Sequence, residues 1–365
     1  MSWTDQNFMR LALSLGRRGQ GRTWPNPAVG CVIVRDGRII GRGWTAPGGR
    51  PHAEMQALTQ AKDARGATVY VTLEPCAHHG KTPPCAEALI KAGVARVVAA
   101  IADADPRVSG KGFAMLQEAG IEVTPGICAE EATRDLGGFL SRVSTGNPHV
   151  SLKLAQSFDG RIATASGHSQ WITGPEARRV VHGMRARHDA VMIGAGTARA
   201  DDPMLTVRDM GFDAQPVRVV VSKLIDLPLM SKLAMTARDV PLWICHGPDA
   251  DDAIKQAWEG LGARLLPCPL QGRQLDMGRV LEALGKAGLT RVFCEGGNAL
   301  AASLLQAELV DELVGFTAGL AIGAEGLPGI GVLGLVDLTE APRFELMECR
   351  PVGGDVLHRW HARAD

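Results

Sequence analysis

A histidine, a glutamate and two cysteines follow one another early in the chain in an order that suits a metal site. They are His52-Ala53-Glu54, then Pro75-Cys76, then Cys85. Zn²⁺ prefers imidazole nitrogen and thiolate sulfur, and a catalytic zinc uses three protein ligands so that one coordination position stays open. We therefore expect His52, Cys76 and Cys85 to bind zinc, and Glu54 to act as the proton carrier.

Each of these residues has a simpler explanation when it is taken alone. A single cysteine is most often a small buried apolar side chain, and a single histidine is most often structural. The spacing is also unusual, because eight residues separate Cys76 from Cys85 whereas short zinc knuckles use about two to four. The metal site is favoured by the joint arrangement, since chance would have to place all four residues in order at the ends of predicted elements.

The local pattern around these residues predicts alternating strands and helices. Residues 28–40 form an apolar stretch interrupted by Asp36-Gly37, which predicts a hairpin. A helix is expected to open at Pro51-His52, and a strand over 67–73 is expected to end just before Cys76. Backbone N–H groups at such a strand-to-helix junction favour the thiolate form of a cysteine. A further helix over 86–93 and a strand over 96–101 complete an α/β pattern.

Length and composition predict a two-domain protein without a polyanionic partner. The chain has 365 residues, and turn residues at 145–148 suggest a division into 1–146 and 147–365. The formal net charge is zero, which argues against nucleic acid as a partner. Eight scattered cysteines without a paired spacing predict reduced thiols in a cytoplasmic protein. We find no signal peptide and no apolar run of membrane-spanning length.

The second half contains motifs that are weak one by one. A strand over 189–197 ends in glycines and is followed by a loop over 200–208, and Thr173 is expected to cap a helix that starts at Pro175. The segment 292–300 predicts a strand, a glycine pair and a helix start, where backbone N–H groups could face a phosphate. No G-x-G-x-x-G fingerprint stands between a predicted strand and a predicted helix with an acidic residue about 20 positions later, so a standard dinucleotide-binding domain is not indicated.

Taken in order, these motifs resemble the bifunctional deaminase/reductase family of riboflavin biosynthesis. The first half carries H-A-E, the run P-C-A-H-H-G-K-T-P-P-C and Pro25-Asn26-Pro27. The second half carries K-x-A-x-S-x-D-G, S-Q-W-I-T, G-A-G-T-x-x-x-D-x-P-x-L-x-x-R and E-G-G. The resemblance implies a cytidine-deaminase-like α/β/α domain over 1–146 and a dihydrofolate-reductase-like α/β domain over 147–365. Phe158 departs from the family pattern, which tends to have leucine at that place.

The activity implied by the resemblance has two steps. The first is zinc-dependent hydrolytic deamination of 2,5-diamino-6-(5-phosphoribosylamino)pyrimidin-4-one, with Glu54 moving the proton. The second is NADPH-dependent reduction of the ribosyl group of 5-amino-6-(5-phosphoribosylamino)uracil to ribityl, for which the cofactor supplies the hydride.

The resemblance also implies which residues bind the substrate and the cofactor. Substrate contacts in the first half are expected from Asn26, His78 and Lys81. Substrate contacts in the second half are expected from Lys153, Ser169, Arg185, Leu205, Arg208 and Glu295. NADPH is expected against Ala155, Trp171, Thr197, Asp201, Ser222, Gly297, Asn298, Ala299, Leu300, Ala301, Ala302 and Ser303.

Several alternatives remain open at this point. Lys81 could be a solvated loop lysine and Arg185 a solvated helix arginine, and the pattern does not separate His78 from His79. A nucleic-acid base editor of the same superfamily and a zinc-stabilised binding module with four protein ligands are the competing classes. We expect a small-molecule substrate, no nucleic acid or membrane partner, and a homo-oligomer whose order the sequence leaves open. The preference for NADPH over NADH and any communication between the two sites also remain open.

Overall fold

The computed structural model describes residues 3–78, 83–105, 109–211 and 213–363. The chain divides into two compact units, Met1–Gly146 and Asn147–Asp365, hereafter unit 1 and unit 2. Within the described ranges, no helix combines the length and the apolar character that crossing a membrane requires.

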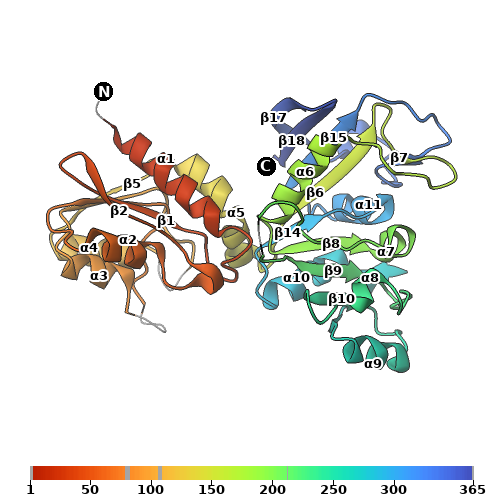
Figure 1. Cartoon of the computed structure of the whole chain (residues 1–365), viewed down its shortest axis with the longest axis horizontal. Coiled ribbons are helices and arrows are strands. Elements are labelled where there is room, and N and C mark those ends of the chain that lie inside the picture. The colour runs from red at the N-terminus through yellow and green to blue at the C-terminus, as the bar shows by residue number, and fades with distance from the viewer. Residues whose placement is uncertain (1–2, 79–82, 106–108, 212, 364–365) are drawn as a thin grey trace. The chain divides into compact units, whose positions relative to one another are not determined.

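Unit 1 is built on a five-stranded sheet, counted over its described residues, in the order β2-β1-β3-β4-β5 (Figure 1). The strands are β1 (Gly30–Arg35), β2 (Arg38–Trp44), β3 (Thr68–Val71), β4 (Arg96–Ala99) and β5 (Glu122–Pro125). The helices are α1 (Asp5–Gly16), α2 (Ala53–Ala61), α3 (Cys85–Lys91), α4 (Lys111–Glu118) and α5 (Ala129–Thr145). Strands β3, β4 and β5 run parallel, and β1 is antiparallel to both of its neighbours.

The predicted hairpin is present. Strands β1 and β2 are joined by Asp36 and Gly37, whose φ angles of 51° and 72° are both left-handed. Two successive left-handed residues match the twist of the flanking strands, which is why Asp-Gly is favoured at this place.

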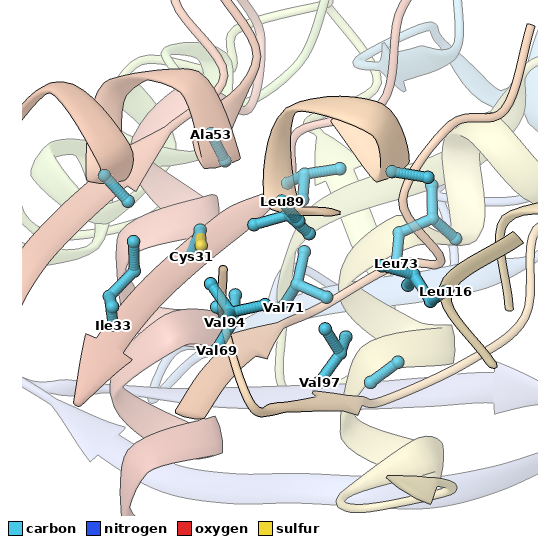
Figure 2. Close-up of a cluster of buried hydrophobic side chains, with 14 of the residues drawn as sticks. Cys31, Ile33, Ala53, Val69, Val71, Leu73, Leu89, Val94, Val97 and Leu116 are labelled. Carbon is cyan, nitrogen blue, oxygen red and sulfur yellow. The ribbon is translucent and has the colours of Figure 1, made fainter. Parts of the chain in front are cut away.

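Helices cover both faces of this sheet because successive strand residues point to opposite sides. Val69 and Val71 lie under Ala53 of α2 and Leu89 of α3 (Figure 2). Tyr70, between them, packs on the other face in a cluster to which α1 and α5 contribute. The expected α/β/α layering of the first domain is therefore confirmed.

Two glycines let α2 lie directly on strand β2. A Cβ atom on Gly43 would lie 2.1 Å from the carbonyl oxygen of Ala53, and one on Gly41 would lie 2.2 Å from that of Ala57. No side chain fits at either position. The backbone contact fixes the distance between strand and helix, and with it the location of the first turn of α2.

Unit 2 contains a nine-stranded sheet, again counted over described residues, in the order β11-β10-β9-β8-β14-β6-β15-β18-β17. Its strands are β6 (His149–Ser157), β8 (Ala190–Gly194), β9 (Val217–Val221), β10 (Leu242–His246), β11 (Arg264–Pro267), β14 (Arg291–Cys294), β15 (Glu312–Ala318), β17 (Phe344–Val352) and β18 (Asp355–Ala362). All neighbours from β11 to β15 are parallel, whereas β17 and β18 form an antiparallel edge. Short pairs are formed by β7 (Arg161–Ala163) with β16 (Leu327–Pro328) and by β12 (Leu270–Gln271) with β13 (Gln274–Leu275).

The helices of unit 2 connect the parallel strands and bury apolar side chains. They are α6 (Pro175–Arg185), α7 (Ala195–Asp201), α8 (Lys232–Met235), α9 (Asp252–Gly260), α10 (Met277–Lys286) and α11 (Asn298–Gln306). Ala177 and Val181 of α6 pack on Phe293 and Phe316, and Trp258 of α9 is fully buried beside β10. The α/β class expected for the second domain is confirmed.

Two local predictions in unit 2 were wrong. The strand expected to run to Thr197 ends at Gly194, where its partner β9 also ends, and the helix α7 begins at once. The N-cap of α6 is Gly174 and not Thr173. The Gly174 N–H donates to Asp355 Oδ2 at 2.7 Å, a contact between residues far apart in sequence that sets the start of this helix, and Arg178 donates to the Thr173 carbonyl at 2.7 Å.

Candidate metal centre and cofactor pocket

The three predicted zinc ligands come together in unit 1. His52 is the N-cap of α2, Cys85 is the first residue of α3, and Cys76 lies in the loop after β3. His52 Nδ1 is 3.3 Å from Cys85 Sγ and 3.7 Å from Cys76 Sγ. In the described part of the chain, these residues form a group whose ligand atoms all lie within 4.8 Å of one another. One imidazole and two sulfurs at such distances fit Zn²⁺.

The surroundings of Cys76 favour its thiolate form. The thiol of Cys85 and the imidazole of His52 form hydrogen bonds to the Cys76 sulfur. These hydrogen bonds outweigh the effect of burial and lower the pKa of Cys76 to about 4. The Cys85 N–H also donates to that sulfur at 3.3 Å. The same contact with Cys76, together with burial, raises the pKa of Cys85.

Glu54 lies one residue into α2 beside this group and is buried, with 4% of its surface exposed. Burial raises the pKa of Glu54, while the nearby His52 opposes the shift. A carboxyl group with a raised pKa next to a metal site suits proton transfer, because it can both accept and return a proton near neutral pH.

The predicted substrate residues of unit 1 have different outcomes. The half-buried side chain of Asn26 packs against Gly49, where a Cβ atom would lie 2.0 Å from Asn26 Nδ2, just before the Arg50-Pro51-His52 segment. His78 is half-buried two residues after Cys76, and its Nδ1 has no hydrogen-bond partner among the described atoms. Lys81 and His79 lie outside the described residues.

Sequence reasoning missed Glu74, which lies two residues before Cys76 and is 3% exposed. Its carboxylate accepts hydrogen bonds from the backbone N–H groups of Asp103, Gly110, Gly112 and Phe113, at 2.9 to 3.2 Å. A glutamate at the end of an apolar strand was the available clue, because a buried charge needs partners.

Unit 2 has a cavity of about 810 Å³ at the carboxyl ends of its parallel strands. Ligands of open α/β sheets bind at this edge. Ten of the predicted residues line the cavity, namely Lys153, Ala155, Ser169, Trp171, Arg185, Thr197, Asp201, Leu205, Arg208 and Glu295. The volume lies in the range of sites that enclose a cofactor or a small ligand.

A charged cluster lies in the wall of this cavity. Glu295 directly follows β14 and pairs with Arg185 at 2.5 Å and with Lys153 at 3.6 Å. Burial alone would raise its pKa, but Arg185 and Lys153 prevail and lower the pKa of Glu295 to about 2. The Arg185 side chain is 13% exposed, so the solvated-arginine alternative was wrong.

Trp171 is held at the cavity wall by a residue that the sequence did not indicate. The guanidinium of Arg178 lies 4.5 Å from the centre of the Trp171 ring. Trp171 is 67% exposed and offers a flat apolar surface to the cavity. Arg179 and His182 of the same helix also line the cavity.

The remaining predicted cofactor residues do not line the cavity: residues 297–303 lie around the start of α11, and Ser222 directly follows β9. Gly297 is the N-cap of α11, and a Cβ atom there would lie 3.2 Å from Thr197 Oγ1. The side chains of Leu300, Ala301 and Ala302 are buried, and Ser303 bonds back to the Ala299 carbonyl. Only the backbone of the first turn, near Asn298, is suited to a phosphate. Ser222, at the end of β9, donates to Asp226 at 2.8 Å.

Comparison with known proteins agrees with this division. Residues 2–101 match the model of the cytidine and deoxycytidylate deaminase zinc-binding region, and residues 148–358 match that of the RibD C-terminal domain. The riboflavin biosynthesis protein RibD of Escherichia coli is 43% identical, over 97% of this chain and 98% of the relative.

Solved structures give the same result. RibD of Acinetobacter baumannii has a TM-score of 0.87 at 40% identity, with 99% of both chains covered. A diaminohydroxyphosphoribosylaminopyrimidine deaminase/5-amino-6-(5-phosphoribosylamino)uracil reductase from Thermotoga maritima has a TM-score of 0.86 at 32% identity, over 98% of this chain and 99% of that chain.

The fold and the two sites define an enzyme that combines a zinc-dependent deaminase with a reductase and acts on a small molecule. The chain belongs to the RibD family of bifunctional riboflavin-biosynthesis enzymes. Zinc and NADPH are the cofactors of this type of enzyme, as expected from the motifs.

Proposed function

We propose that unit 1 carries out the deamination and unit 2 the reduction, each with the residues described above. The observation that supports this assignment best is the convergence of His52, Cys76, Cys85 and the buried Glu54 at the starts of two helices. The substrate of unit 1 is the diamino-ribosylamino-pyrimidinone phosphate, and that of unit 2 is the deaminated aminouracil.

In unit 1, His52, Cys76 and Cys85 would hold the zinc. When bound, zinc would lower the pKa of a water molecule and so supply a nucleophile at neutral pH. Glu54 accepts a proton from the attacking water and delivers it to the departing ammonia. Asn26 and His78 orient the pyrimidine, and Lys81 meets the ribosyl phosphate as a point charge.

In unit 2, NADPH would supply the hydride for reduction of the ribosyl group. Ala155, Trp171, Thr197 and Asp201 would hold the cofactor, and the backbone at the start of α11 would meet its phosphates. Glu295 holds Lys153 and Arg185 in place, and these cations position the ribose and the pyrimidine together with Ser169 and Leu205. Arg208 at the cavity rim is suited to the substrate phosphate, because a guanidinium binds phosphate oxygens in pairs.

The proposal extends to the setting of the enzyme. Scattered cysteines without a paired spacing favour a cytoplasmic enzyme, and a net charge of zero favours one that does not act on nucleic acid. Leu346, Met347 and Val356 are exposed on β17 and β18 at the open edge of the sheet in unit 2, which favours a homo-oligomer. Light scattering on the purified protein should give a mass of at least two chains, and a monomeric mass would contradict this point.

Removal of zinc should separate the two activities. After chelation we expect ammonia release from the diamino pyrimidine phosphate to stop, because Glu54 acts on a water molecule whose pKa the metal has to lower. NADPH oxidation with the deaminated aminouracil phosphate should continue, since unit 2 uses no metal. Added Zn²⁺ should restore ammonia release. Loss of both activities, or of neither, would reject the assignment of one reaction to each unit.

A further inference from the structure

Cys76 is held differently from the other two ligands. His52 is the N-cap of α2 and Cys85 is the first residue of α3, so the start of a helix fixes each of them, whereas Cys76 lies in the loop after β3. The Cys76 carbonyl accepts from the Ala86 N–H at 3.2 Å, which ties its far side to α3. The chain on the other side of Cys76, just before it, is held by Glu74.

The carboxylate of Glu74 joins the β3 end to the start of α4. One oxygen accepts from the N–H groups of Gly112 and Phe113, at 2.9 and 3.2 Å. The other accepts from those of Asp103 and Gly110, at 3.1 and 3.0 Å. Each oxygen therefore accepts two hydrogen bonds. A carboxylate can do this, whereas a neutral amide has only one acceptor oxygen.

The contact is too close for adjustment. A Cβ atom on Gly112 would lie 2.0 Å from the carbonyl oxygen of Pro75, the residue between Glu74 and Cys76. The start of α4 therefore presses directly on the peptide that leads into the cysteine. Because only Pro75 separates Glu74 from Cys76, a shift of the Glu74 side chain should move Cys76 as well.

We propose that Glu74 is a positioning residue for the metal centre, which sets the location of the Cys76 sulfur by anchoring its loop to the start of α4. The inference rests on the proposed role of Cys76 as a zinc ligand. A purely structural cap of α4 would stabilise the helix without affecting the metal. The two roles can be distinguished by following the metal itself.

The test replaces Glu74 by glutamine in the full-length enzyme. Zinc transfer to a colorimetric chelator should become about 10- to 100-fold faster, the range typical for outer residues that orient metal ligands. In Co²⁺-substituted protein, the thiolate-to-cobalt charge-transfer band should shift or weaken, because one sulfur is displaced. Glu74→Asp keeps the charge on a shorter arm and should give an intermediate release rate. NADPH oxidation by unit 2 should not change.

Asp5→Asn is the matched control. Asp5 accepts from Tyr70 at 2.7 Å and pairs with Arg96, in the same unit but on the α1 side of the sheet. This variant should loosen unit 1 without changing zinc release. Wild-type release and an unchanged cobalt band in Glu74→Gln would overturn the proposal, as would equally fast release from Asp5→Asn. If Glu74→Gln does not accumulate as folded protein, Glu74→Asp decides by the same two measurements.

A failure of the proposed function gives a different result. If His52, Cys76 and Cys85 were not the ligands, the wild-type protein would bind no stoichiometric zinc and Co²⁺ would give no thiolate band. Zinc release and the cobalt band of Glu74→Gln are therefore compared with those of the wild type only after the wild type has been shown to bind the metal.

Discussion

Glu54→Gln is expected to lower the rate of ammonia release by about 100-fold or more, the usual effect of losing a general acid–base group. The amide has the same shape but cannot accept a proton from water. Burial raises the pKa of Glu54 because it disfavours the charged carboxylate, so an uncharged amide of the same shape should be tolerated there and we expect the variant to fold. Ammonia release from the diamino pyrimidine phosphate is the measurement.

Two further readings make this result specific. Zinc content should stay at the wild-type level, because Glu54 is not one of the three ligands, and NADPH oxidation by unit 2 should be unchanged. Glu118→Gln, at an exposed position of α4, is the control and should behave as wild type. Undiminished ammonia release would remove Glu54 from its role, and loss of zinc would make it a ligand instead.

Glu295→Gln should weaken unit 2 and stop NADPH oxidation. The substitution leaves Lys153 and Arg185 poorly exposed without their anionic partner, and breaking a buried ion pair in this way costs about 3–5 kcal/mol. Hydrogen exchange of the backbone amides of β14 and α6 measures this loss of stability in unit 2 independently of unit 1. Glu282→Gln, which removes a half-buried surface carboxylate paired with Arg279 and Lys286 in the same unit, should have a small effect.

The pH dependence of the same comparison has a definite sign. The pKa of Glu295 is lowered from 4.5 to about 2 in the folded protein. The ionised carboxylate therefore contributes fully to stability above its unfolded pKa, and the contribution is lost as the pH falls toward the folded value. The difference in unfolding free energy between wild type and Glu295→Gln should be constant above pH 4.5 and shrink between pH 4.5 and about 2. A difference that grows on acidification would contradict the pairing.

Local chemistry made much of unit 1 predictable from the sequence. Asp36-Gly37 suits only a few turns, and the order of strand, Pro75-Cys76 and helix leaves few ways to place the thiolate. The ligand set could be recognised because metal coordination restricts residue types as well as spacing.

Contacts between distant segments were not predictable in this way. The Glu74 carboxylate binds a segment about thirty residues further on, and the chain between them gives no periodic pattern that would announce the contact. Arg178 was missed because its partners, the Trp171 ring and the Thr173 carbonyl, precede the helix and depend on how that loop turns. The start of α7 was missed because β8 ends at Gly194, where its neighbour β9 also ends, and the local sequence does not show where the neighbouring strand stops.

The glycine contact between β2 and α2 has a consequence for how the deaminase can vary. Gly43 has no reactive atom, yet a methyl group there would collide with the helix whose first turn bears an imidazole ligand and the proton carrier. Many substitutions in β2 should therefore inactivate the deaminase, although this strand contributes no ligand and no catalytic residue. A survey of tolerated residues should find β2 as intolerant of substitution as the ligand positions.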